Sequence, residues 1–88
     1  MARTEKDPAV LIAQYIEPNP DRPGIADARL CEHAVPVWAL VGYAQATGRD
    51  AAAVARAYRV PQEAVEAAFA YRDRHPAVIE ARIAANVA

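Results

Sequence analysis

Two short apolar segments separated by a tight joint constrain the fold of this chain more than any other feature. Each segment repeats its apolar residues at the spacing of one helix face: Val54, Ala55 and Tyr58 in the first, and Val65, Ala68 and Phe69 in the second. Asp50 is a good N-cap for the first helix, and Pro61 opens the second, where its missing N–H costs nothing. Val60 lies between them, at the corner. The sequence from Asp50 to Arg74 therefore predicts a helix-turn-helix.

Two more helices are expected around this motif. Pro36 opens one of them, and Gly48 ends it after four apolar residues at helical spacing: Val37, Leu40, Val41 and Ala44. Trp38 and Tyr43 lie on other faces of this helix, which predicts a central helix or part of a dimer seam. For Trp38 the alternative is contact with a partner protein. His75 and Pro76 end the helix-turn-helix, and a last helix follows with this apolar stripe: Val78, Ile79, Ile83 and Val87.

The N-terminal part is expected to hold a short helix and a β-hairpin. Asp7 and Pro8 form an N-cap and first-turn pair that predicts one or two helical turns. A dense cluster of prolines and polar residues follows at 18–24, so regular structure cannot cross it. Residues 28–31 could then return along residues 15–17 as an antiparallel pair. The expected organisation is an arm with a short helix at 1–14, and a single domain at 15–88.

Composition limits what such a chain does. Its 88 residues suffice for one small domain, and 23 of them are alanines, which bury little area each. We therefore expect a homodimer with two-fold symmetry, which would bury the larger apolar residues Trp38, Tyr43, Ile79 and Ile83. The formal charge of −1 gives no global attraction to nucleic acid or to anionic membranes. Without a signal peptide or an apolar run of membrane-spanning length, and with Cys31 as the only cysteine, the chain is expected in the cytoplasm.

The sequence offers little chemistry for catalysis. Cys31, His33 and His75 are too few and too poorly spaced for a zinc site or a defined nucleophile and base pair. The three glycines are isolated, so no phosphate-binding loop is present. We therefore expect no enzyme, no cofactor and no small-molecule substrate.

Nucleic-acid contact is the other candidate activity of the helix-turn-helix. The candidate residues lie on it or at its edges: Arg49, Arg56, Arg59 and Gln62. The alternative is a solvated face that contacts nothing. Glu63 and Glu66, near the start of the second helix, face phosphates unfavourably. Binding to duplex DNA is therefore expected to be weak.

Residues 15–75 resemble the small bacterial family called domain of unknown function 433. That family's hairpin pattern is met by Arg22, Pro23, Ile25, Arg29 and Leu30, whereas Asp21, Asp27 and Ala28 depart from it. Its helical pattern is met by Gly48, Val54, Tyr58, Val65, Ala67, Ala68, Phe69, Ala70 and Tyr71. The resemblance implies an antitoxin with a homeodomain-like three-helix core, paired with a PIN-type ribonuclease toxin.

The expected function is accordingly an antitoxin-like module that binds and neutralises such a toxin and represses its own operon. The alternative is a dimeric helix-turn-helix regulator of DNA without a toxin. The candidate partner contacts are Arg22, Pro23, Ile25, Arg29 and Trp38.

Overall fold

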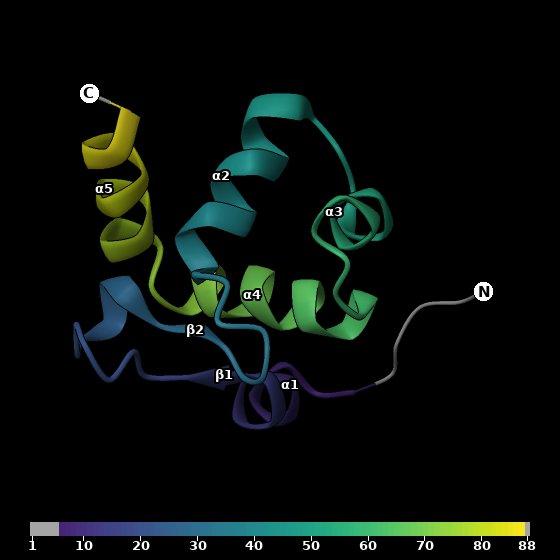
Figure 1. Ribbon diagram of the computed structural model, residues 1–88, viewed down its shortest axis with the longest axis horizontal. Coiled ribbons are helices and arrows are strands. Elements are labelled where there is room, and N and C mark those ends of the chain that lie inside the picture. Colours follow the sequence, from purple (N-terminus) through teal and green to yellow (C-terminus); the bar gives the residue numbers. More distant parts are fainter. Residues whose placement is uncertain (1–5, 88) are drawn as a thin grey trace.

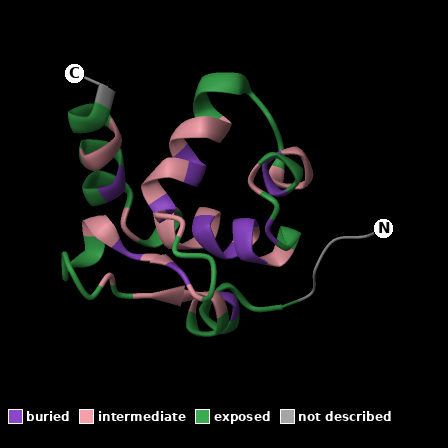
Figure 2. Ribbon diagram, viewed as in Figure 1, coloured by how far each residue is buried: buried purple, intermediate pink, exposed green. Residues whose placement is uncertain are grey.

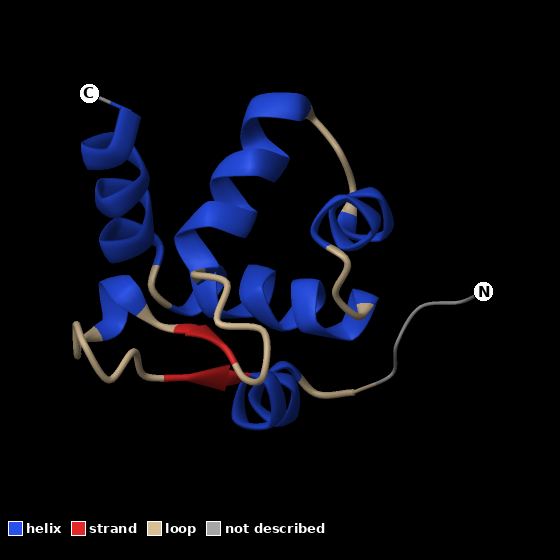
Figure 3. Cartoon of the chain, in the orientation of Figure 1, coloured by secondary structure: helices blue, strands red, loops and turns tan. Residues whose placement is uncertain are grey.

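The computed structural model describes residues 6–87, with side chains for residues 6–86. Residues 1–5 of the expected arm and the side chain of Val87, expected on the last apolar stripe, lie outside this part. Within it the chain is mainly helical, with one short two-stranded antiparallel sheet (Figure 1, Figure 3), so the expected mainly α fold with a hairpin is confirmed. The elements are α1 (Pro8–Tyr15), β1 (Ile16–Glu17), the 3₁₀ helix η1 (Ile25–Asp27), β2 (Arg29–Leu30), α2 (Val37–Thr47), α3 (Ala51–Tyr58), α4 (Gln62–Arg74) and α5 (Pro76–Val87).

Capping groups set the ends of three helices, as expected. The Asp7 carboxylate accepts a hydrogen bond from the Ala9 amide at 2.8 Å before α1. Asp50 does the same for α3, accepting from the Ala53 amide at 3.0 Å. Gly48 ends α2 in the left-handed conformation, with φ 70° and ψ 20°.

Prolines precede or open three other helix starts. Pro76 is the first residue of α5, because His75 before it has left the helical region, with φ −130° and ψ 56°. Pro36 and Pro61 differ from expectation by one position, since they are N-cap residues rather than first helical residues. Their extended ψ angles of 143° and 145° place the start of each helix at the next residue.

The hairpin has the expected pairing. Ile16 lies opposite Leu30, and Glu17 opposite Arg29. The strands are only two residues long, because α1 continues through Tyr15, which as a β-preferring residue was expected in the strand. The outer edge of β2 is covered by the chain that follows it: the Leu30 amide donates to Val35 O at 2.9 Å.

α4 is the central helix of the described residues. Helices α1, α2, α3 and α5 all contact it, and α5 also packs on α2 and η1 (Figure 1). Four α4 residues have no exposed surface at all: Ala64, Val65, Ala67 and Ala68. Figure 2 shows this buried segment between the layer of α2 and α3 and the layer of α1 and the sheet. The helix after Pro36 was expected as the central one or as part of a dimer seam; it is not the central helix, because it covers one side of α4, and the dimer seam stays a prediction.

α3 and α4 meet across a tight turn at residues 59–61, where the sequence predicts the joint of a helix-turn-helix. Arg59 adopts the left-handed conformation there (φ 58°, ψ 48°), a position that glycine fills most easily. Val60 is buried and its amide donates to Ala55 O at 3.1 Å. Tyr58 and Phe69 are partly buried against the core. The homeodomain-like arrangement of this pair stays a prediction.

Ile79 corrects part of the argument for a dimer. It was expected to need a partner subunit for burial, yet it is 0% exposed within the single chain, between α5 and the core. Trp38, Tyr43 and Ile83 also pack partly against that core. The total exposed area of 5201 Å² is close to the roughly 5,000 Å² that a compact monomer of 9.5 kDa exposes. The homodimer itself stays a prediction, but the need to bury these residues no longer supports it.

Candidate protein-interaction surface

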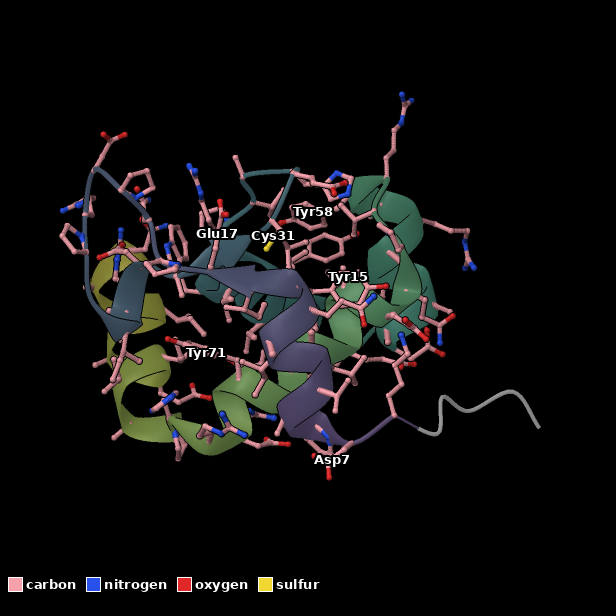
Figure 4. The ribbon with its side chains drawn as sticks, turned by 90° about the horizontal axis from the view of Figure 1, so that it is seen from below. Asp7, Tyr15, Glu17, Cys31, Tyr58 and Tyr71 are labelled. Carbon is pink, nitrogen blue, oxygen red and sulfur yellow. The ribbon has the colours of Figure 1, made fainter. Side chains whose placement is uncertain are left out.

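An apolar groove opens between α1, the hairpin loop and α4. It has a volume of about 340 Å³ and is lined by Ile12, Ile16, Glu17, Pro18, Gly24, Ile25, Ala28 and Tyr71. Only Glu17 among these carries a charge. Figure 4 shows Glu17 and Tyr71 on the same side of α1. We call this site the apolar groove.

A hydrogen bond from α4 and one glycine hold the wall of the groove formed by η1. The Tyr71 hydroxyl donates to Ile25 O at 3.2 Å, which ties η1 to α4. Burial raises the pKa of Tyr71 above its ordinary value, which extends to more alkaline pH the range over which the phenol can donate. Gly24 enters η1 with φ 132°, a conformation that side chains rarely adopt. Ile25 remains 42% exposed beside the groove.

The outer face of α1 continues the apolar surface of the groove. Leu11 is buried, whereas Ala9, Val10 and Ala13 are exposed, Val10 by 50%. The helix sequence PAVLIAQY contains no charged residue. Helices at a protein surface usually carry charged or polar side chains on the outer side. The outer face of α1 carries Ala9, Val10 and Ala13 with Gln14 as its polar residue and no charge, which marks α1 as an interaction candidate.

Polar contacts hold α1 on the first turn of α4. The Tyr15 hydroxyl donates to Glu63 Oε1 at 2.9 Å, and Lys6 Nζ lies 3.1 Å from the same oxygen. The hydrogen bond with Glu63, followed by burial, raises the pKa of Tyr15. The first turn of α4 is thus engaged by α1.

The charges around the groove are paired within the chain. Arg29 Nε lies 2.8 Å from Glu17 Oε2. Arg82 Nε lies 3.1 Å from Asp27 Oδ1, and the Arg82 guanidinium also stacks on Trp38, 4.5 Å from the ring centroid. The two carboxylates at the groove, Glu17 and Asp27, therefore already have partners within the chain.

The five predicted partner contacts do not form one site. Arg22 and Pro23 are exposed in the loop that leads into the groove, and Ile25 lines it. Arg29 lies on the hairpin, in its ion pair with Glu17. Trp38 lines a second hollow of about 280 Å³, together with Ala39, Gly42, Tyr43, Tyr58, Ile83 and Asn86. The aromatic rings that line this hollow already have contacts: Tyr43 contacts Tyr58, and Trp38 contacts Arg82.

The predicted nucleic-acid contacts are all exposed: Arg49, Arg56, Arg59 and Gln62. Gln62 donates to Glu66 Oε2 at 3.0 Å. On α4 it shares one helix face with Glu66, Phe69 and Asp73, while α1 packs on one side of this ridge and α2 and α3 on the other. The ridge carries two carboxylates, of which Asp73 is paired with Arg72 at 3.0 Å. Glu66 makes this ridge unfavourable for phosphates, and the exposed cation of α4, Arg74, lies at the other end of the helix from Gln62.

Cys31 and His33 line a small hollow beside Tyr15. Burial is the main cause that raises the pKa of the Cys31 thiol, which makes it a poor nucleophile at neutral pH. Within residues 6–86, histidine, cysteine and carboxylate side chains do not gather in groups of three that could hold a metal. His75 stacks on Tyr71 instead, with 4.8 Å between the ring centroids.

Most residues of the apolar groove were missed from the sequence. Ile12, Ile16 and Pro18 were assigned to a short helix, a strand and a turn, and Tyr71 to a helical pattern. One usable signal was the uncharged sequence of α1, because an apolar helix at the surface is a candidate for contact with a partner.

No helix in residues 6–87 combines the length and hydrophobicity that a membrane span requires.

A search of protein-family models, of curated proteins and of solved structures returned no match to this chain. The resemblance to the domain of unknown function 433 family therefore stays a prediction.

Proposed function

We propose that this chain is an antitoxin-like interaction module, which binds a partner protein at the apolar groove and the outer face of α1. The partner expected from the sequence is a PIN-like ribonuclease toxin, neutralised when the complex forms. The proposal places the chain in the cytoplasm, where such a ribonuclease meets its RNA.

The observation that carries the proposal is the uncharged outer face of α1 next to the groove. Among residues 6–86, Val10 and Ile25 are the two most exposed large apolar residues, at 50% and 42%, and they lie on these two neighbouring features. Most large apolar side chains elsewhere are buried or half-buried. Concave, mainly apolar sites of about 300 Å³ and above are where proteins bind ligands and partner side chains.

The alternative, a DNA-binding regulator, has less support. The open ridge of α4 is acidic, and α1 covers one side of the helix that would enter a major groove. Arg49, Arg56 and Arg59 are exposed and lie outside that helix, so they would contact phosphates rather than bases. Repression of an operon would then require a dimer that presents these arginines on both half-sites.

The proposal is tested by co-expression with the product of the adjacent gene. We expect the tagged chain to copurify with that protein and to inhibit its ribonuclease activity on a generic RNA. Ile25→Asp places a charge in the groove and should abolish both effects, because an unpaired charge in an apolar interface is strongly unfavourable. Ala57→Asp is the control, since it adds the same charge at an exposed position on α3.

Two results would count against the proposal. One is the absence of any complex with neighbouring gene products. The other is a complex that Ile25→Asp and Ala57→Asp weaken equally, which would move the interface away from the groove.

A further inference from the structure

We infer that the partner segment bound in the apolar groove is a helix with an uncharged apolar face, packed alongside α1. This inference rests on the proposed function and specifies the chemistry of the partner. It follows from three features: the edges of the sheet, the shape of α1 and the paired charges.

The sheet offers no edge to an added strand. The edge of β2 is taken, since the Leu30 amide donates to Val35 O and the Val37 amide donates to Ala28 O, both at 2.9 Å. On the other side, β1 is two residues long and is followed by Pro18, which has no N–H to donate. Strand addition needs a continuous row of backbone donors and acceptors. The bound segment must therefore be held by its side chains.

α1 has the shape of a helix-packing surface. Ala9 and Ala13 are four residues apart and form an exposed row of small side chains. Ile12 of α1 and Ile16, the first residue of β1, line the groove beside this row. Rows of residues four apart are the ridges that interdigitate when two helices pack, and small side chains let the axes approach closely. A partner helix therefore fits over Ala9 and Ala13 with its larger apolar residues in the groove.

The electrostatics select an uncharged helix face. Glu17, the one charged residue among those that line the groove, is paired with Arg29, and Asp27 is paired with Arg82, so neither carboxylate needs a cation from a partner; the exposed Arg22, in the loop that leads into the groove, lies outside its lining. A carboxylate or ammonium brought into the groove would lose hydration without gaining an ion pair. Binding should therefore depend on apolar contact and change little with salt.

The test uses phage-displayed peptides of about 18 residues, long enough for about five helical turns. One pool carries apolar residues at helical spacing, a second alternates them as in a strand, and a third is rich in charged residues. We expect selection on the full chain to enrich the helical pool, with apolar and uncharged residues along one stripe. Synthetic versions should gain helicity by circular dichroism when they bind.

Two variants in exposed alanines locate the site. Ala13→Arg adds a charge to the outer face of α1 and should weaken binding by at least about tenfold, or 1.4 kcal/mol. Ala57→Arg makes the same change on α3, a helix of equal length, and should alter binding less than about twofold. Raising NaCl from about 50 to about 500 mM should also change the dissociation constant less than about threefold.

The possible outcomes separate the inference from the proposed function. Enrichment of strand-like or charged peptides whose binding Ile25→Asp abolishes would overturn the inference and leave the proposed function standing. Failure of all three pools to yield peptides sensitive to Ile25→Asp would overturn both. Self-association of the wild-type chain that Ala13→Arg abolishes, measured by sedimentation equilibrium, would make a second copy the occupant and also overturn the inference.

Discussion

Replacing Ile79 by alanine tests whether α5 is anchored inside the monomer. Ile79 is 0% exposed and belongs to the core cluster. The substitution removes roughly three carbon atoms, and at about 0.8 kcal/mol each their transfer to water accounts for about 2.4 kcal/mol. The cavity left behind adds to this, so we expect a loss of about 3 kcal/mol in the free energy of unfolding. Since a domain of this size has about 4–13 kcal/mol in total, the effect is large.

Urea denaturation followed by Trp38 fluorescence is the measurement. Trp38 lies against Arg82 of α5, so its emission reports the docking of that helix. With a denaturant slope of about 1.2 kcal/mol per molar urea, the midpoint should fall by about 2.5 M. The control is Val78→Ala, one residue earlier and 39% exposed, for which we expect a loss under about 0.5 kcal/mol.

Protein concentration then separates core from dimer seam. If Ile79 packs inside one chain, Ile79→Ala should lower the free energy of unfolding by the same amount at a low and at a tenfold higher protein concentration. A loss of less than about 0.5 kcal/mol, or a destabilisation that depends on concentration, would show that the reasoning is wrong. Ile79 would then belong to an interface between subunits.

Three further predictions test other parts of the fold. Gly48→Ala should lower the free energy of unfolding by about 1 kcal/mol, because φ is 70° at this position. Gly42→Ala, in the middle of α2, should be neutral or stabilising, because a Cβ there would lie 3.5 Å from an Ile83 methyl, an ordinary contact distance. Thermal denaturation compares the two variants. Asp50→Ala should cost about 1 kcal/mol by removing the cap of α3, measured by urea denaturation, and Asp50→Asn should restore most of it. Because the pKa of Tyr15 is raised in the folded chain, the protonated phenol stabilises the fold fully below pH 10, and this stabilisation is lost as pH rises through the raised pKa. Tyr15→Phe should therefore make the free energy of unfolding fall less steeply above pH 10. An unchanged slope in pH-dependent denaturation would exclude a stabilising role of the Tyr15 phenol.

Local rules predicted the helices well because their signals lie in neighbouring residues. Asp7 and Asp50 cap the helices that follow them, and Gly48 ends α2, since each needs only its own backbone and that of adjacent residues. The hairpin was also placed correctly, because the turn cluster at 18–24 leaves few ways for the chain to return. Tyr15 shows the limit of propensity: α1 continues through it, since its side chain gains a hydrogen bond with Glu63 of α4.

The arrangement of these elements could not be predicted in the same way. Periodicity shows that Val65 and Ile79 lie on apolar faces, but it does not show which element covers them. α4 is the central helix because α1 packs on the side opposite α2 and α3. The sequence pattern of α1 is too weak to predict this contact. For the same reason, the groove could not be foreseen: it joins Ile12 to Tyr71, residues from opposite ends of the chain.

Three hydrogen bonds that tie the N-terminal third to α4 and α5 reach far along the chain. Tyr15 to Glu63, Ile25 to Tyr71 and Asp27 to Arg82 span 48, 46 and 55 positions. Contacts of this length close late in folding, whereas α2, α3 and α4 are neighbours in sequence and pair early. During synthesis residues 6–30 leave the ribosome before α4 and α5, the helices to which these bonds tie them. We therefore expect the hairpin and α1 to dock last, so that a nascent chain acquires its binding surface only once Arg82 has emerged.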